Sequence, residues 1–159
     1  QIANASTNGG HAARITLEGT NGYVGIHTSA PTHSLEVSGD FKATEEVILG
    51  TTSTDLGSGT TSTLTPASSV HLLTATSITA GAEGMHIMTL ASGTSAGQIL
   101  KIIMNTTTNN QPIMISPANI LGSYSVIAIE NDKQGAAFEF IWNGSKWVIM
   151  NNNSLATIG

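Results

Sequence analysis

The sequence predicts an all-β protein, and three observations support this fold class. Only 9% of the 159 residues are Asp, Glu, Lys or Arg, whereas soluble domains average about 25%. Thr, Ser, Asn and Gly supply the polarity instead, and these residues disfavour helices because their side chains compete for backbone hydrogen bonds or are too small. Apolar residues recur in short runs cut by Gly, Pro or Asn, which is typical of strands and turns.

The first fifty residues contain four short segments with strand character. These are residues 14–18, 23–26, 34–37 and 47–49, and most of them alternate apolar with polar side chains, which predicts one buried face. About eight large apolar side chains cannot offset the ordering of about forty residues, at roughly 1–2 kcal/mol of backbone entropy each. We therefore expect residues 1–50 to form a shaft or collar module in which identical chains pack around an axis.

Two further regions follow. Residues 51–69 are almost entirely Thr, Ser and Gly, so we expect a neck or linker there. The runs at 70–73, 85–90 and 99–104 lack clean alternation, which predicts that both faces are covered, in a sandwich or at a subunit interface. More strands are expected at 112–116, 124–129, 136–142 and 146–150. We interpret residues 70–159 as an antiparallel β-sandwich-like head.

The last pair of these strands is the clearest local feature of the sequence. Asn143-Gly144 between two apolar runs predicts a β-hairpin with a type I′ turn. A two-residue loop would place Phe140 opposite Trp147, and a four-residue loop would place Trp142 there. Either arrangement gives an aromatic cross-strand pair worth about 0.2–1 kcal/mol.

Charge and cysteine content limit the possible partners. The net charge is −5 and the five basic residues are dispersed, so we expect no nucleic-acid binding. The chain has no Cys, so stability must come from packing and oligomerisation. No apolar run reaches the roughly 20 residues that span a bilayer, and we expect no membrane insertion. Because the chain begins at Gln1 rather than Met, we expect it to be part of a longer or processed protein.

The sequence shows no pattern of catalytic or metal-binding residues with the required spacing, so we assign no catalytic residue, metal or cofactor. His27 and His33 could form a three-His site only if three chains met at an axis. His86, in an apolar run, is expected to be a hydrogen-bonded core residue. Two Asn/Thr segments are candidate exposed tips for contact with a receptor, because uncharged amides and hydroxyls bind sugars well. Their residues are Asn105, Thr107, Asn109 and Asn110 in one, and Asn151 and Asn152 in the other.

The segment from Gly22 to Thr44 resembles a short module of phage tail fibres and of some bacterial surface proteins. The module reads approximately V-G-I-G-T-x-x-P-x-x-x-L-x-V-x-G-x-x-x-A-T. Val24-Gly25-Ile26, Pro31, Leu35, Val37 and Gly39 match it in spacing, whereas His27 stands where the family usually has Gly. Residues 70–159 resemble a distal module of marine phage fibres, on the segments Ala96-Gly97-Gln98, Ile115–Asn119 and Ile141–Ile149.

These resemblances imply a homotrimeric virion fibre segment that contacts a host surface glycan or protein and joins other virion proteins upstream. The expected location is the virion, outside the cell, and no enzymatic activity is expected. Three alternatives remain open: a capsid-attached fibre or decoration protein, a bacterial adhesin or extracellular filament subunit, and a polysaccharide depolymerase.

Overall fold

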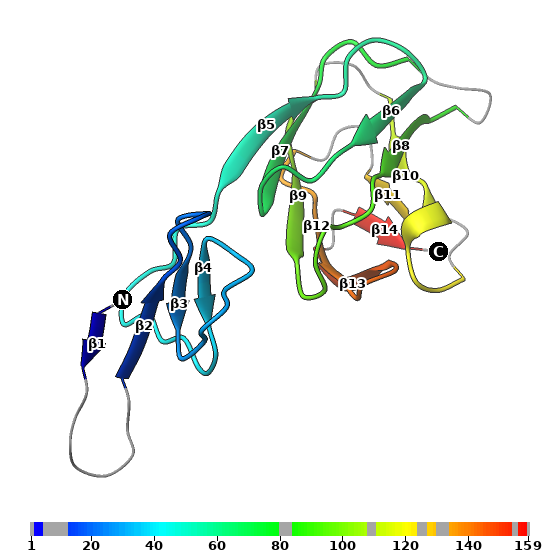
Figure 1. Ribbon diagram of the computed structural model, residues 1–159. Helices are drawn as coiled ribbons and strands as arrows, with labels where there is room; N and C mark the ends of the chain where they lie inside the picture. Colours follow the sequence, from blue (N-terminus) through cyan, green and yellow to red (C-terminus); the bar gives the residue numbers. More distant parts are fainter. Residues whose placement is uncertain are drawn as a thin grey trace. The chain divides into compact units, whose positions relative to one another are not determined.

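The structure is a computed structural model that describes residues 2–4, 13–79, 84–107, 111–123, 127–129, 134–153 and 156–158. The all-β prediction is confirmed, because the described residues contain strands and one short 3-10 helix, η1 (Pro117–Asn119). The chain divides into two compact units, residues 1–47 and residues 48–159. Figure 1 shows the strands of both units.

The N-terminal unit contains one four-stranded sheet in the order β1-β2-β3-β4. Its strands are β1 (Ile2–Asn4), β2 (Ala13–Leu17), β3 (Val24–Ile26) and β4 (Leu35–Val37). β1, β2 and β3 pair antiparallel, whereas β3 and β4 are parallel although only eight residues connect them. Residues 47–49, which we expected to form a strand, belong to no strand, and Val47, Ile48 and Leu49 are exposed.

The second unit contains two five-stranded sheets. One has the order β13-β12-β9-β7-β5 and the other β14-β11-β10-β8-β6. The strands of the first are β5 (Thr51–Asp55), β7 (Val70–Ala75), β9 (Ile99–Thr107), β12 (Ala137–Trp142) and β13 (Trp147–Asn152). Those of the second are β6 (Thr61–Leu64), β8 (His86–Leu90), β10 (Ile113–Ile115), β11 (Ile127–Ile129) and β14 (Ala156–Ile158).

Successive strands alternate between these two sheets in the first half of the unit. β5, β7 and β9 are parallel neighbours in one sheet, and β6, β8 and β10 are parallel neighbours in the other. Each pair of consecutive strands therefore makes one coil, and three coils stack as in a β-helix. In contrast, β11 pairs antiparallel with β10 and β14, and β12 pairs antiparallel with β9 and β13. The expectation of an antiparallel head is thus wrong for the coils, because alternation within a strand does not reveal the direction of its partner.

A single apolar core holds the two sheets of the second unit together, as in a sandwich. Leu73, Leu100 and Phe138 from one sheet belong to the same buried cluster as Met88 and Leu90 from the other. Along β7 and β12, buried residues alternate with partly exposed ones. The sandwich therefore covers only one face of each of these two strands, whereas the run at 70–73 predicted that both faces of β7 are covered, in a sandwich or at a subunit interface.

The expected neck at residues 51–69 is also corrected by the structure. Its Thr and Ser residues form β5 and β6, the first coil, and the division between units lies after Val47. Thr is a favourable strand residue, and Leu56 and Leu64 at the ends of these strands are buried in the core. Leu56 and Leu64, together with the backbone pairing of β5 and β6 to the next coil, hold residues 51–69 although this segment carries few apolar side chains.

The predicted hairpin is present with the four-residue loop, one of the two expected arrangements, but its turn is not of type I′. Trp142 pairs with Trp147, so the loop has the four residues 143–146. Among the described residues His27 alone has a positive φ without being Gly, so Asn143 does not adopt the type I′ conformation. Its Oδ1 instead accepts hydrogen bonds from the backbone N–H of Ser145 and Lys146 at 2.9 and 2.8 Å. An Asx turn replaces the expected turn, because the Asn143 side chain accepts the hydrogen bonds of these two backbone N–H groups.

Candidate functional site

The four candidate receptor-contact residues that the structure describes lie at the ends of two strands rather than in loops. Asn105 and Thr107 extend β9, and Asn151 and Asn152 end β13. The side chains of Asn105 and Asn151 are exposed, whereas Asn152 is half-buried. Asn109 and Asn110 lie outside the described residues, as does the side chain of Thr107.

β12 brings these two strand ends together at one end of the sheet. The side-chain Nε2 of Gln134 donates to the carbonyl oxygen of Asn105 at 2.6 Å. On the other side, Asn153 accepts from the N–H of Ala137 at 3.0 Å and donates to the carbonyl oxygen of Gly135 at 2.7 Å. Since β12 alone separates β9 from β13, the two strand ends lie roughly 10 Å apart.

We call this the amide end, defined by Asn105, Gln134, Asn151, Asn152 and Asn153. Its groups are uncharged donors and acceptors, and Asn153 binds the start of β12 through two hydrogen bonds. Such groups suit ligands that are rich in hydroxyls. Sequence reasoning missed Gln134, because this residue comes next to Asn105 only through the pairing of β9 with β12.

A second candidate surface is one face of the N-terminal sheet. The registers align Ile15 with Ile26 and Val37, and Leu17 with Val24 and Leu35, so these six side chains share a face. Ile15, Leu17 and Leu35 are 42%, 51% and 57% exposed. Within residues 15–47, the range where side-chain exposure is described for this unit, the buried residues are Gly25 and Pro31. We call this surface the apolar face.

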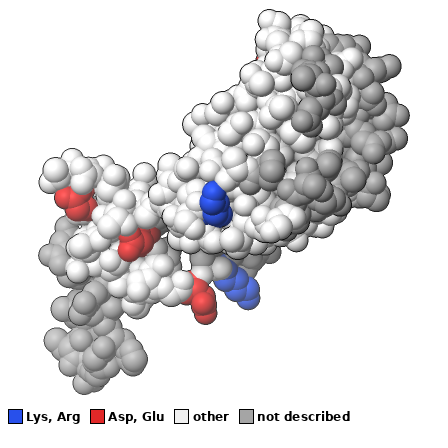
Figure 2. Space-filling view, turned by 90° about the vertical axis from the view of Figure 1, so that its right-hand side faces the viewer, with Lys and Arg blue, Asp and Glu red and all other residues white. Residues whose placement is uncertain are grey.

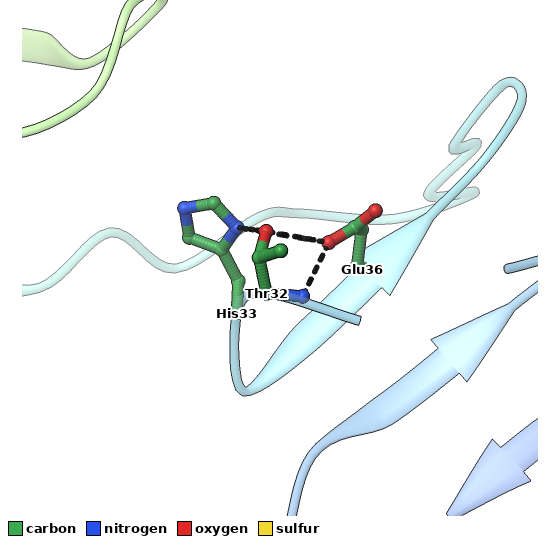
Figure 3. Close-up of polar contacts among 3 residues, drawn as sticks. All are labelled: Thr32, His33 and Glu36. Carbon is green, nitrogen blue, oxygen red and sulfur yellow. Dashed lines mark hydrogen bonds and ion pairs between the residues drawn. The ribbon is translucent and has the colours of Figure 1, made fainter. Parts of the chain in front are cut away.

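The connection between β3 and β4 carries a small polar network, shown in Figure 3. Glu36 Oε2 accepts from the N–H and the hydroxyl of Thr32 at 2.7 and 2.9 Å, and the Thr32 hydroxyl lies 2.9 Å from His33 Nδ1. The hydrogen bond from the backbone N–H of Thr32 holds the pKa of the Glu36 carboxyl below its usual value. This network fixes the turn that enters β4.

Gly25 and His27 determine the backbone geometry at the start of the same connection. His27 has φ 58°, in the left-handed region that favours glycine. At Gly25, an added Cβ would lie 2.7 Å from the carbonyl oxygen of Thr28. The chain therefore turns sharply after β3, with Gly25 required by contact and His27 held in a conformation that Gly adopts more readily.

Two histidines lie in the core of the second unit. His71 and His86 are 1% and 0% exposed. His71 Nε2 accepts the N–H of Ala67 at 3.2 Å, so its Nδ1–H donates to the hydroxyl of Thr54 at 2.8 Å. Burial lowers the pKa of His71, which agrees with a neutral ring.

His86 satisfies its ring in the same manner. Its Nδ1 donates to the carbonyl oxygen of Gly59 at 3.0 Å, and its Nε2 lies 2.8 Å from the hydroxyl of Ser62. The expectation that His86 is a hydrogen-bonded core residue is confirmed. Both histidines reach from the second coil to the first, so they bind β5 and β6 to the rest of the unit.

Charges are sparse on the molecule. Figure 2 shows isolated Lys, Arg, Asp and Glu residues on a surface that is otherwise uncharged where it is described. In the described part of the chain, no three His, Cys, Asp or Glu side chains gather as a metal site would require. The same residues include no helix of the length and apolar character needed to cross a membrane.

Comparison with known proteins adds no assignment. No protein-family model matches the chain, and no curated protein sequence matches it.

Proposed function

We propose that the chain is a segment of a homotrimeric virion fibre, whose N-terminal unit is held in the trimer by its apolar face. The observation that carries this proposal is the alignment of six apolar side chains, three of them exposed and three half-buried, on a sheet that buries no large side chain of its own among residues 15–47. Water contact at these positions costs about 25 cal/mol per Å² of apolar surface. Copies of the same chain remove this cost when they pack face to face.

The turn after β3 supports the resemblance to the fibre module. The module usually has Gly where this chain has His27, and His27 adopts a backbone conformation typical of Gly. Gly25 and Pro31, two matching positions of the module, are the buried residues within 15–47, the part of this unit whose burial is described. The departure at His27 is therefore compatible with a turn that Gly would form at this position.

The native mass of residues 1–159 tests the oligomer. We expect a mass of three times 16.3 kDa by light scattering, and a slowly migrating band on an unheated denaturing gel. A monomer that remains folded would refute the trimer and favour a decoration domain or adhesin that folds alone. Immunogold labelling of particles would then separate tail, capsid and non-virion locations.

We further propose that the amide end contacts a host surface glycan. Uncharged amides at Asn105 and Asn151 are exposed beside a strand end to which Asn153 is hydrogen-bonded. The double variant Asn105→Ala, Asn151→Ala should lose binding on an array of neutral oligosaccharides while it keeps the native mass. Thr63→Ala, an exposed position on the other sheet, serves as the matched control. Equal binding by both variants would refute this role.

A further inference from the structure

The second unit carries few charges, and two of them lie together beside the amide end. Its charged side chains within the described residues are those of Asp55, Lys101, Glu139 and Lys146. Lys101 and Glu139 alternate with buried residues along β9 and β12, so both side chains project from the outward side of this sheet. The registers place Lys101, Glu139 and Asn151 next to one another across three neighbouring strands. We call these three residues the polar row.

The polar row is continuous with the amide end, because Asn151 belongs to both. Asn105, the other exposed amide, lies two residues beyond Ile103, which pairs with Ala137 at the next outward position of β12. Side chains that lie directly opposite each other on antiparallel strands have Cβ atoms about 5 Å apart. The groups of the polar row are therefore close enough to contact one disaccharide together.

The polar row has hydrogen-bonding capacity that the described residues leave unused. Lys101 Nζ pairs with Glu139 Oε1, and no described residue donates a hydrogen bond to Glu139 Oε2. The ammonium group has three donors, so this pair leaves donors for a ligand. The Asn151 side chain likewise makes no hydrogen bond with the described residues. One carboxylate oxygen, an ammonium group and an amide thus face outward together.

Stability alone does not account for this ion pair. The side chains of Lys101 and Glu139 are 37% and 32% exposed, and pairs near the surface contribute little to stability. Their outward neighbours are half-buried aliphatic residues, Val70 and Ile103 beside Lys101 and Ile141 beside Glu139. On the other sheet, the described outward side chains of β6, β8 and β10 are uncharged. A few polar groups among aliphatic ones are typical of sites for small ligands.

We propose that Lys101 and Glu139 extend the glycan site of the amide end and select neutral sugars with adjacent free hydroxyls over acidic sugars. This inference rests on the glycan contact proposed above and adds the residues that determine its specificity. A carboxylate only accepts hydrogen bonds, so Glu139 Oε2 suits a sugar hydroxyl that donates, while the adjacent hydroxyl accepts from the Asn151 amide. A sugar carboxylate or sulfate has no proton to donate to Glu139, and Lys101 is already engaged in the ion pair.

Glu139→Gln tests this selection in the full chain, because it removes the negative charge and keeps the length of the side chain. Asp55→Asn is the matched control, since it removes one negative charge from an exposed residue of β5, three strands from β12 in the same sheet. The probe is an array of neutral and uronic-acid oligosaccharides, followed by titration with the neutral one that the natural chain binds most tightly. We expect Glu139→Gln to weaken neutral binding about tenfold, because hydrogen bonds to charged groups are the stronger ones. It should also bind uronic-acid oligosaccharides more tightly through the freed Lys101, whereas Asp55→Asn should bind both kinds as the natural chain does.

The pattern of binding separates this inference from the role of the amide end. Neutral binding by Glu139→Gln equal to that of the natural chain would overturn the selection by the ion pair, as would a natural chain that binds uronic-acid oligosaccharides as tightly as neutral ones. The amide end stands in both cases if the double variant Asn105→Ala, Asn151→Ala loses binding. A natural chain that binds no oligosaccharide would overturn both proposals.

A second variant keeps the test decisive should Glu139→Gln fail to fold, as native mass and tryptophan fluorescence would reveal. Glu139→Asp keeps the charge but withdraws the carboxylate by one methylene group. We expect it to weaken neutral binding without any gain in uronic-acid binding. Unchanged neutral binding, or a gain in uronic-acid binding, would overturn the role of Glu139.

Discussion

Substitution of Gly93 by alanine should destabilise the second unit through a single contact. An added Cβ at this position would lie 2.7 and 2.8 Å from Cδ2 and Cβ of Trp142, and closer still to its Cγ. The Trp142 ring is 5% exposed, and it packs edge-on against Trp147 with ring centroids 5.2 Å apart. Trp147 is fully buried and donates from Nε1 to the carbonyl oxygen of Ala91 at 2.9 Å.

The magnitude follows from two opposing effects. Forcing one methyl group into a packed core costs about 1–3 kcal/mol. Alanine also restricts the unfolded chain, which stabilises the folded state by about 0.4–1 kcal/mol. We therefore expect Gly93→Ala to lower the free energy of unfolding by about 1–2 kcal/mol, and the Tm by several degrees.

Tryptophan fluorescence during urea unfolding measures this effect, because Trp142 and Trp147 are the two tryptophans of the chain. Gly50→Ala is the matched control, since its added Cβ meets Ser68 Cβ at an ordinary 3.6 Å. The control should be neutral or slightly more stable than the natural chain. If Gly93→Ala is as stable as Gly50→Ala, the packing of Trp142 against residue 93 is not as described.

Three further predictions concern histidines. Burial lowers the pKa of His71, so below the unfolded pKa of about 6.5 the unfolded chain binds more protons than the folded one. The free energy of unfolding should therefore fall as pH drops through that window and stay constant just above it, as urea titrations at several pH values would measure. His86→Ala removes the contacts with Ser62 and Gly59. It should lower the free energy of unfolding by about 1–3 kcal/mol and speed hydrogen exchange in β6 more than in β13. His27→Gly relieves a left-handed backbone at φ 58°, which should stabilise the oligomer by up to about 1 kcal/mol. The temperature at which the oligomer dissociates, measured on denaturing gels of samples heated in steps, should rise accordingly.

Clear results would contradict each of these three expectations. Stability independent of pH between 8 and about 5 would mean that the folded and unfolded states bind protons at His71 equally. Unchanged exchange in β6 after His86→Ala would show that the histidine does not hold this strand. A lower dissociation temperature for His27→Gly would show that the imidazole makes a contact that outweighs the backbone strain.

The elements with apolar periodicity could be predicted from sequence. The run at 136–142 shows alternation that matches the burial pattern of β12, and the Asn-Gly pair marks the hairpin even though its turn type differs. His86 could be assigned to the core because a polar ring inside an apolar run needs internal hydrogen-bond partners. These signals are local, so they do not depend on which strand lies next to which.

The pairing of the coils could not be predicted from sequence. β5 and β6 carry hydroxyls instead of an apolar stripe, so they read as a linker, and their partners lie in strands that begin at Val70 and His86. The side chain of Thr54 meets His71, 17 residues away, only after the parallel register forms. Likewise the amide end depends on β12 lying between β9 and β13, which no spacing along the chain encodes.

The first coil also determines how the second unit carries mechanical load. Any tension that passes along the chain from the N-terminal unit enters through residue 48 and reaches β5 before any other strand of the second unit. No side chain of β5 itself is buried, and the strand is held by its parallel ladder to β7 and by the bond between Thr54 and His71. Force therefore acts first on the hydrogen bonds of this ladder, whereas the buried Trp and Phe side chains belong to β12 and β13, which follow much later in the chain.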